Sequence, residues 1–328
     1  MKKAAAIDSD DMSGYEAVRD GDGALFDFSD RGRISVSGSE AVMFLNGLIT
    51  NDLKTLGENR WMPAAFPNVQ GRLLAAVRVI RRANDLLLDT EAVTREKVLK
   101  ILERFTLAGD FKVADVTDET SQFSFQGRSA EKLLESAFGV TGLPRDGVWQ
   151  NERVTIIRST HTGEDGFDVI GGPSVWHLAV EACSTLAGNQ EREILRIEAG
   201  IARYGIDMDE SNVVTETNLE DAVSFTKGCY LGQEIIVRIK HRGHVAKKLT
   251  GLRFETNEEI EPGAAIKSTD DKEIGRVTSA VFSPKLQTTI GLGYVRYEHL
   301  APGTSVVVNG VPATTHELPV IRGSWYKD

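Results

Sequence analysis

This sequence of 328 residues has few cysteines, no long apolar runs and no surplus of positive charge. Two cysteines are too few for a disulfide framework, which favours a reduced, intracellular protein. The 48 acidic residues outnumber the 38 basic ones, and the net charge of −10 argues against broad, sequence-independent binding to nucleic acids or membranes. A hydrophobic content of 41% excludes a disordered chain, and the length suggests about two domains.

The N-terminal residues carry no recognisable targeting signal. Only four apolar residues, at positions 4–7, separate two lysines from an acidic run. A signal peptide needs an apolar stretch of roughly 7–15 residues, and a membrane span needs about 20. We therefore expect a cytoplasmic protein with no membrane contact, in which residues 1–22 form a polar tail and order begins near Gly23.

Strand-like and helix-like patterns alternate from residue 24 to residue 199, which predicts a mixed α+β region. Beyond Leu249, short strand-like runs are punctuated by glycine and proline, the pattern of a small antiparallel barrel or sandwich. We predict an α+β region over residues 23–240 and a barrel domain over residues 241–328. The expected strands are 24–36, 73–79, 86–89, 111–116, 123–125, 154–157 and 167–170, and the expected helices are 40–49, 93–105, 129–138, 174–186 and 191–199.

Residues 227–234, KGCYLGQE, place a cysteine between two glycines. Gly228 and Gly232 permit tight turns and close approach of the backbone to a ligand. Lys227 beside Cys229 would lower the pKa of the thiol by favouring the thiolate, which is the reactive form. The remaining polar or aromatic members of this octet are Tyr230, Gln233 and Glu234.

A buried structural cysteine in a glycine-bounded turn explains Cys229 equally well, because most cysteines behave as small hydrophobic residues. Cys183 provides a contrast, since it lies in an apolar helical pattern and is expected in the core. The residue types alone leave both interpretations of Cys229 open.

The stretch from residue 235 to residue 254 contains no acidic residue. Such a concentration of cations would suit an anionic ligand tail or an RNA backbone, and the alternative is a solvated connection between domains. His241 and His244 have a metal-like spacing, but no cysteine or nearby carboxylate completes a site, so no metal is expected. The cations are Arg238, Lys240, Arg242, Lys247, Lys248 and Arg253.

Residues 161–168, HTGEDGFD, form a glycine-punctuated acidic turn between two expected strands. Glu164 or Asp168 would accept hydrogen bonds from a heterocycle that presents paired N–H groups. The alternative is an ordinary hairpin turn, where aspartate and glycine are common.

Arg196 lies among apolar neighbours in the expected helix 191–199. A buried arginine needs a carboxylate partner, which is either internal or supplied by a ligand. We favour an internal partner, and the candidates are Glu198 and Asp207.

Several segments together resemble the aminomethyltransferase-like superfamily, which includes the glycine-cleavage T protein and the folate-binding YgfZ-type proteins. They are residues 25–52, the HTGEDGFD turn, LRIEAGIARYGID at 195–207, KGCYLGQE, and VTSAVFSP at 277–284. The resemblance covers nearly the whole chain. KGCYLGQE is similar to the YgfZ-type signature, and the T protein lacks this cysteine octet.

The resemblance implies two ferredoxin-like α+β units and a C-terminal antiparallel β-barrel around a central hole of folate size. It also implies tetrahydrofolate in that hole, in contact with Glu164, Arg196 and Asn68, with the basic stretch near its glutamate tail. Cys229 would then be the cysteine considered essential in the YgfZ-type subgroup. That subgroup's role is the maturation or repair of iron–sulfur enzymes and, through them, tRNA modification.

One departure separates the subfamilies. The T protein carries a reactive aspartate on the strand after an Asn-x-x-Gly turn, whereas this chain has Ala75 and Ala76 there. An alanine neither acts as a general base nor stabilises a developing charge. We therefore favour a tetrahydrofolate-binding accessory protein whose partners are iron–sulfur proteins or their assembly machinery. The alternatives are a folate-dependent aminomethyltransferase or one-carbon transferase, and a non-catalytic RNA-contacting protein.

Overall fold

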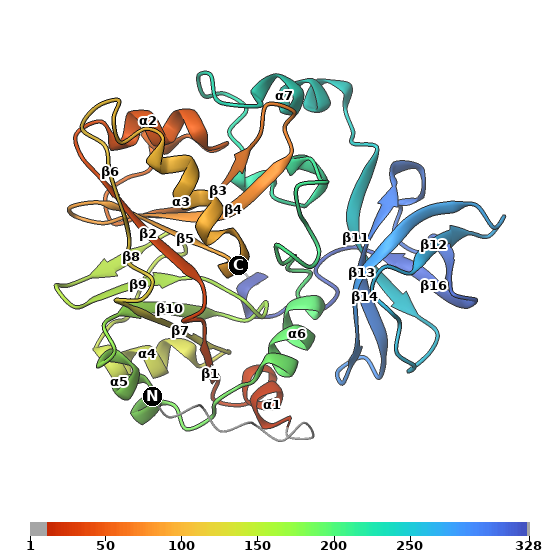
Figure 1. Ribbon diagram of the computed structural model, residues 1–328. Coiled ribbons are helices and arrows are strands. Elements are labelled where there is room, and N and C mark those ends of the chain that lie inside the picture. Colours follow the sequence, from red (N-terminus) through yellow and green to blue (C-terminus); the bar gives the residue numbers. More distant parts are fainter. Residues whose placement is uncertain (1–11, 327–328) are drawn as a thin grey trace.

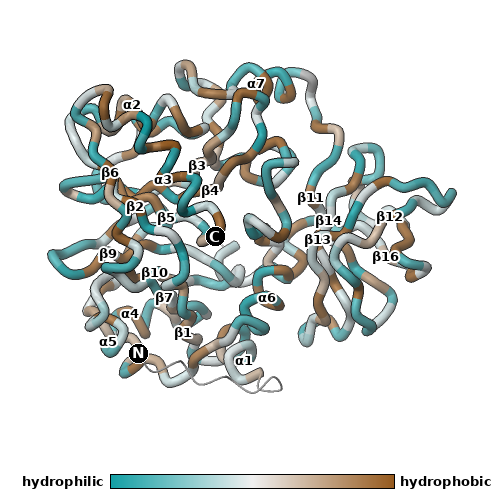
Figure 2. The backbone as a smooth tube through the Cα atoms, viewed as in Figure 1, coloured by the Kyte–Doolittle hydropathy of each residue, from teal (hydrophilic) through white to brown (hydrophobic). Residues whose placement is uncertain are grey.

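Two five-stranded sheets and a closed six-stranded barrel form the framework of the molecule (Figure 1). This computed structural model describes residues 12–326. Figure 2 shows hydrophobic and hydrophilic residues alternating along many strands, as expected where only one face of a strand is buried. The α+β fold with a C-terminal antiparallel barrel is confirmed. None of the helices in the described part is long and apolar enough to cross a bilayer.

The first sheet has the strand order β3-β4-β5-β2-β6 and carries two helices. Strand β4 (Leu73–Arg81) alternates buried and half-buried residues, and its buried side chains join those of α2 (Ala41–Leu48) and α3 (Arg95–Glu103) in one core. The other strands are β2 (Gly32–Ser37), β3 (Trp61–Pro67), β5 (Leu86–Thr90) and β6 (Lys112–Asp115).

The second sheet has the order β1-β7-β10-β9-β8, with helices α4 (Ala130–Phe138) and α5 (Val175–Ala182) packed on it. Strand β1 (Ala24–Asp27) pairs with β7, although β2, the next strand in the chain, belongs to the first sheet. The two units are therefore interleaved in sequence. The remaining strands are β7 (Ser121–Gln126), β8 (Val148–Gln150), β9 (Val154–Arg158) and β10 (Gly166–Gly171).

Helix α6 (Asn189–Glu198) connects the second sheet to the barrel, because it contacts both α1 (Ser13–Arg19) and the barrel strand β13 (Glu273–Ser283). Helix α1 buries Tyr15, Val18 and Arg19, so order begins before Gly23 and the expected polar tail is wrong for residues 13–22. Residues 1–11 lie outside the described part. Gly200, just after α6, has the left-handed φ of 69° that its sequence position predicts.

The barrel order is β11-β14-β13-β12-β15-β16. Helix α7 (Gln233–Arg242) precedes the barrel, so the predicted boundary after residue 240 falls inside that helix. The strands are β11 (Lys247–Phe254), β12 (Ala265–Ser268), β13 (Glu273–Ser283), β14 (Thr288–Arg296), β15 (Ser305–Val308) and β16 (Val311–His316). Single-turn helices occur at Leu53–Thr55, Ala92–Thr94, Val214–Glu216, Glu220–Ala222, Tyr297–His299 and Ser324–Tyr326.

Candidate functional site

The cysteine octet packs against the first sheet unit. The Leu231 N–H donates a hydrogen bond of 3.2 Å to the Gly47 carbonyl of α2. Gly232 has a φ of 77°, and a Cβ there would lie 2.3 Å from the Asn68 carbonyl oxygen. Only glycine allows this approach, so the octet and the turn around Asn68 are neighbours. The Asn68 carboxamide itself holds that turn, since its Oδ1 accepts the N–H groups of Gln70 and Arg72, both at 2.9 Å.

Lys227 anchors the octet to the C-terminal end of α2. Its Nζ donates three hydrogen bonds, a full complement for an ammonium group. Burial lowers the pKa of this lysine to about 8. The Nζ also lies 5.1 Å from the centroid of the Tyr230 ring. The three acceptors are the carbonyl oxygens of Asn46 at 2.6 Å, Ile49 at 3.0 Å and Asn51 at 2.7 Å.

Cys229 is exposed, whereas Cys183 is buried, as expected for a core position. A Cβ added to Gly228 would meet no atom within 4 Å, so the thiol lies at an open part of the surface. Activation of Cys229 by Lys227 stays a prediction. Of the remaining octet side chains, Gln233 donates from Nε2 to the Lys227 carbonyl at 3.3 Å, and the Tyr230 hydroxyl is buried with no hydrogen-bond partner in the described chain.

The expected basic patch lies on α7. Glu234 pairs with Arg238 one turn later, and the Lys240 Nζ lies 5.1 Å from the centroid of the Phe225 ring. The side chain of Arg242 falls outside what the structure describes. The first half of the stretch forms a helix that leads into the barrel, and both interpretations of its cations stay predictions.

Glu164 is a buried carboxylate that joins three distant parts of the chain. Its Oε1 accepts a hydrogen bond from Nη1 of Arg19 at 2.9 Å, and its Oε2 accepts the Ser324 N–H at 2.7 Å. Burial raises the pKa of Glu164, but the hydrogen bonds from Ser324 and Arg19 outweigh this effect and hold it below its ordinary value. The C-terminal segment reaches this residue through the middle of the molecule (Figure 1).

Arg196 finds its partners inside the protein. Its Nη1 lies 2.7 Å from Oδ2 of Asp207, and its Nη2 lies 2.6 Å from Oε2 of Glu193. The same Nη2 donates to the Ser279 hydroxyl of β13 at 3.0 Å. Internal pairing was predicted and is confirmed with Asp207, whereas Glu198 pairs with another arginine.

Alternating charges continue from this pair into both sheets. Asp168, the other acidic candidate in the HTGEDGFD turn, lies at the far end and also contacts His161 at 3.0 Å. Burial raises the pKa of Asp168, but Arg78 and His161 outweigh it and lower the pKa strongly. In order, the contacting side chains are Asp168, Arg78, Asp89, Arg31, Glu91, Arg203, Glu193, Arg196 and Asp207.

Arg192 lies beside this chain of charges without joining it. Its side chain is nearly buried, with 8% exposed, and its Cζ sits 4.2 Å from the centroid of the Phe28 ring. Across the described residues, no hydrogen-bond acceptor or carboxylate contacts its guanidinium. Burial lowers its pKa, and nearby Arg203 lowers it further. Arg192 was not among the site residues predicted from the sequence, although it lies one helical turn before Arg196.

The two alanines of β4 point in opposite directions. Ala75 is fully buried in the core beneath α2 and α3. Ala76 packs with Tyr204 and Tyr230 on the opposite face. Strand alternation puts Arg78 on the same face as Ala76, and Arg78 contacts Asp168 of the second sheet. Ala76 therefore faces the region between the units, and Ala75 does not.

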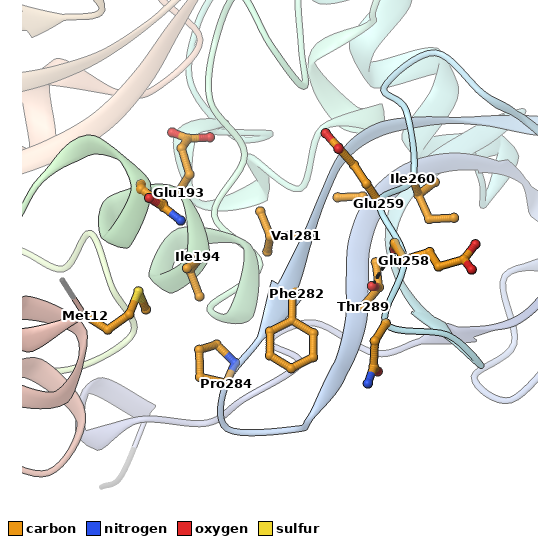
Figure 3. A pocket seen from close by; sticks show the side chains of 13 residues that line it. Met12, Glu193, Ile194, Glu258, Glu259, Ile260, Val281, Phe282, Pro284 and Thr289 are labelled. Carbon is orange, nitrogen blue, oxygen red and sulfur yellow. Dashed lines mark hydrogen bonds between the residues drawn. The ribbon is translucent and has the colours of Figure 1, made fainter. Parts of the chain in front are cut away.

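A cleft of about 720 Å³ is lined by residues of α6 and of the barrel (Figure 3). Ile194, Val281 and Phe282 form its apolar floor, and Glu258 and Glu259 lie on one side of it. Of the site residues predicted from sequence, none that the structure describes lines this cleft.

Comparison with known proteins gives consistent matches over both halves of the chain. Residues 10–227 match the GCVT N-terminal domain, and residues 247–327 match the glycine cleavage T-protein C-terminal barrel domain. The aminomethyltransferase of Rubrobacter xylanophilus is 34% identical over 322 residues, covering 94% of this chain and 85% of that protein. That of Thermoanaerobacter pseudethanolicus is 30% identical over 334 residues, covering 96% and 89%.

A solved structure shares the fold. The crystal structure of the glycine cleavage system aminomethyltransferase T from Bartonella henselae superposes with a TM-score of 0.87 at 24% identity. The match covers 95% of this chain and 89% of that one. The arrangement of two sheet units and a barrel is therefore common to both proteins.

Proposed function

The chain belongs to the glycine cleavage T-protein family, and we propose that it binds a tetrahydrofolate where its two sheets and α6 meet. The observation that carries this proposal is Arg192, a residue with 8% of its surface exposed whose guanidinium has no hydrogen-bond or ion-pair partner among the described residues. A buried arginine with free N–H donors is costly unless an acceptor reaches it. A folate has hydrogen-bond acceptors on its carboxylates, its amide and its ring, and the N–H donors of Arg192 could bind any of these. When bound, tetrahydrofolate supplies ring and bridge nitrogens that carry one-carbon units.

The other arginine and the acidic turn fit this ligand less directly. Arg196 already has Asp207 and Glu193 as partners, and its hydrogen bond to Ser279 of β13 ties α6 to the barrel. Both oxygens of Glu164 accept hydrogen bonds from the chain itself. Each oxygen keeps a lone pair for a further N–H donor, but the carboxylate is already held by the chain. Because Arg196 is paired internally and Arg192 is not, we assign the folate contact to Arg192 instead of Arg196.

The proposed function does not include the aminomethyl transfer route of the T protein. That route needs a carboxylate, and the position facing the region between the units holds Ala76. The competing candidate is a folate-dependent aminomethyltransferase, which is the name of the relatives that match along the whole chain. Incubating the protein with tetrahydrofolate and an aminomethylated carrier distinguishes the two, because only the competing candidate produces methylenetetrahydrofolate.

The finer proposal is an accessory role in the assembly or repair of iron–sulfur proteins, with Cys229 as the contact group. Its support is the exposed thiol on an octet that is fastened by Lys227 and Gly232. One cysteine cannot supply the four thiolates of an ordinary cluster site, so the thiol would act on a partner's cluster, sulfur species or thiol.

Titration calorimetry with tetrahydrofolate tests the folate proposal. We expect wild type to bind, and Arg192→Gln to weaken binding at least tenfold with only a small change in melting temperature, because this guanidinium has no internal hydrogen bond or ion pair to lose and only its contact with the Phe28 ring is affected. Arg196→Gln is the matched control on the same helix, and it should lower the melting temperature. Absence of binding by wild type would overturn the proposal, and unchanged binding by Arg192→Gln would remove its main support.

Complementation tests the role of Cys229. In a strain that lacks the protein, we expect wild type and Cys183→Ala to restore the activity of iron–sulfur enzymes and Cys229→Ala to fail. Western blotting for equal amounts of each variant separates loss of function from loss of protein. Full restoration by Cys229→Ala would show that the thiol is not needed.

A further inference from the structure

Three cations gather on the outward face of the barrel. Lys247 begins β11, Arg276 lies in β13 and Arg296 ends β14. The strand register places Lys247 opposite Arg296, and Arg276 opposite Tyr294. Tyr294 and Arg296 are two residues apart on one strand and so share a face. Val295 between them points into the barrel core.

None of these three cations has an ion-pair partner among residues 12–326. Other barrel lysines do, since Lys267 lies 2.8 Å from Asp271 and Lys272 lies 3.1 Å from Asp270. Like charges directly opposite each other on neighbouring strands destabilise a sheet. The facing pair of Lys247 and Arg296 is therefore unfavourable for the free protein, and an anion between them would relieve the repulsion.

The cations surround a cavity of about 510 Å³ that Tyr294 also lines. Tyr294 is buried, with 5% of the residue exposed. Its hydroxyl nevertheless has no hydrogen-bond partner in the described structure. The Lys247 Nζ lies 5.0 Å from the centroid of its ring. A buried hydroxyl without a partner is uncommon, and here it adds an unused donor beside the three cations. The pKa of the nearby Asp209 carboxyl is lowered by its hydrogen bonds from Ser211 and, to a lesser extent, by Arg276 and Lys247, which form no ion pair with it in the described structure.

We propose that this cavity binds a phosphate-bearing ligand, either a phosphate monoester or a diphosphate. Two guanidinium groups offer the forked N–H donors that match phosphate oxygens, and an ammonium group adds a compact point charge. Three cations suit an anion with two or more charges. Glu273 also lines the cavity, and its carboxylate limits the negative charge that the cavity can hold, which favours a compact phosphate or diphosphate over an extended polyanion.

Calorimetry on the full chain tests this proposal with pyrophosphate, ADP, AMP and adenosine. We expect pyrophosphate to bind with an affinity that falls as salt rises, and adenosine not to bind. Tighter binding of ADP than AMP would identify a diphosphate site, and equal binding would identify a monoester site. Absence of binding by pyrophosphate, ADP and AMP would overturn the proposal.

Variants locate the site. The double variant Arg276→Gln, Arg296→Gln should weaken pyrophosphate binding at least tenfold. Tyr294→Phe should weaken it several-fold at an unchanged melting temperature, because the hydroxyl makes no internal hydrogen bond. Lys267→Gln, on the same barrel but paired with Asp271, is the charge-matched control and should bind as wild type does. Equal binding by all variants would overturn the proposal, as would binding of an oligouridylate that pyrophosphate fails to displace.

Discussion

Arg78 and Asp168 connect the two sheets through a single ion pair, with Nη2 of the arginine 2.5 Å from Oδ2 of the aspartate. Asp168 is fully buried, and Arg78 also contacts Asp89 on the neighbouring strand β5. The two sheets thus share one cation between two buried carboxylates. Removing Arg78 would leave Asp168 with only His161 as an ion-pair partner among the described residues, and loss of one partner of a buried ion pair is strongly destabilising in a protein interior.

This arrangement predicts acid sensitivity. Arg31, Arg78 and His161 hold the pKa values of Asp89 and Asp168 below their ordinary range despite burial. Between the folded and unfolded pKa values of these carboxyls, the unfolded chain binds more protons than the folded one. Their contribution to the free energy of unfolding is therefore fully present above about pH 5 and is lost as the pH falls. Urea unfolding between pH 7 and pH 3 measures this. Asp168→Asn should be less stable at pH 7 and show a shallower loss in acid, and an unchanged pH slope would contradict the assignment.

An aspartate should destabilise the protein more at Ala75 than at Ala76, although both residues lie on β4. Ala75→Asp puts a charge into the apolar core beneath α2 and α3, and we expect a loss of about 3–5 kcal/mol in the free energy of unfolding. Ala76→Asp lies on the face of Arg78 and should cost about 1 kcal/mol or less. Chemical denaturation of the two variants measures the difference. Equal losses would show that the faces are assigned wrongly.

Gly232 should be intolerant of a side chain, and Gly228 should tolerate one. Gly232→Ala forces a left-handed backbone and places a Cβ 2.3 Å from the Asn68 carbonyl oxygen. We expect a loss of about 2 kcal/mol or more. A Cβ at Gly228 meets nothing within 4 Å, so Gly228→Ala should change stability by about 0.5 kcal/mol at most. Melting temperatures of the pair provide the test, and similar values would contradict the proposed contact.

Lys227→Met should destabilise the protein by about 2–4 kcal/mol, because three buried carbonyl oxygens lose their charged donor. The same variant separates two roles of the lysine. If its hydrogen bonds only anchor the octet, the rate of Cys229 alkylation by iodoacetamide should be similar in the folded variant and in wild type. A rate at least tenfold lower at pH 7 would indicate that Lys227 also activates the thiol.

The fold was largely predictable from the pattern of residues. Alternating runs located most strands of both sheets, and glycine and proline spacing located the barrel. The helix at residues 233–242 was missed because its cations suggested a solvated connection, whereas Lys240 lies over the Phe225 ring and Arg238 pairs with Glu234. The helix at residues 13–19 was missed because it is short, and burial against α6 stabilises it rather than helix propensity.

The candidate site was predictable in part. Internal pairing of Arg196 followed from the cost of burying an unpaired charge, which applies wherever the helix lies. The same argument could not identify Arg192, because its burial depends on Phe28 of a distant segment. Nor could the sequence reveal that Glu164 accepts the Ser324 N–H, since that contact joins residues 160 positions apart.

Glu164 has a kinetic consequence for the molecule. Arg19 and Ser324, its two partners, are separated from it by 145 and 160 residues in opposite directions along the chain. Closing loops of this length costs more conformational entropy than closing the shorter loops within each unit, so we expect this junction to form after them. A chain in which the sheets and the barrel had already formed would therefore still lack this junction. Once Glu164 has bound both Arg19 and Ser324, the N-terminal helix, the second sheet and the C-terminal segment are all in their native arrangement.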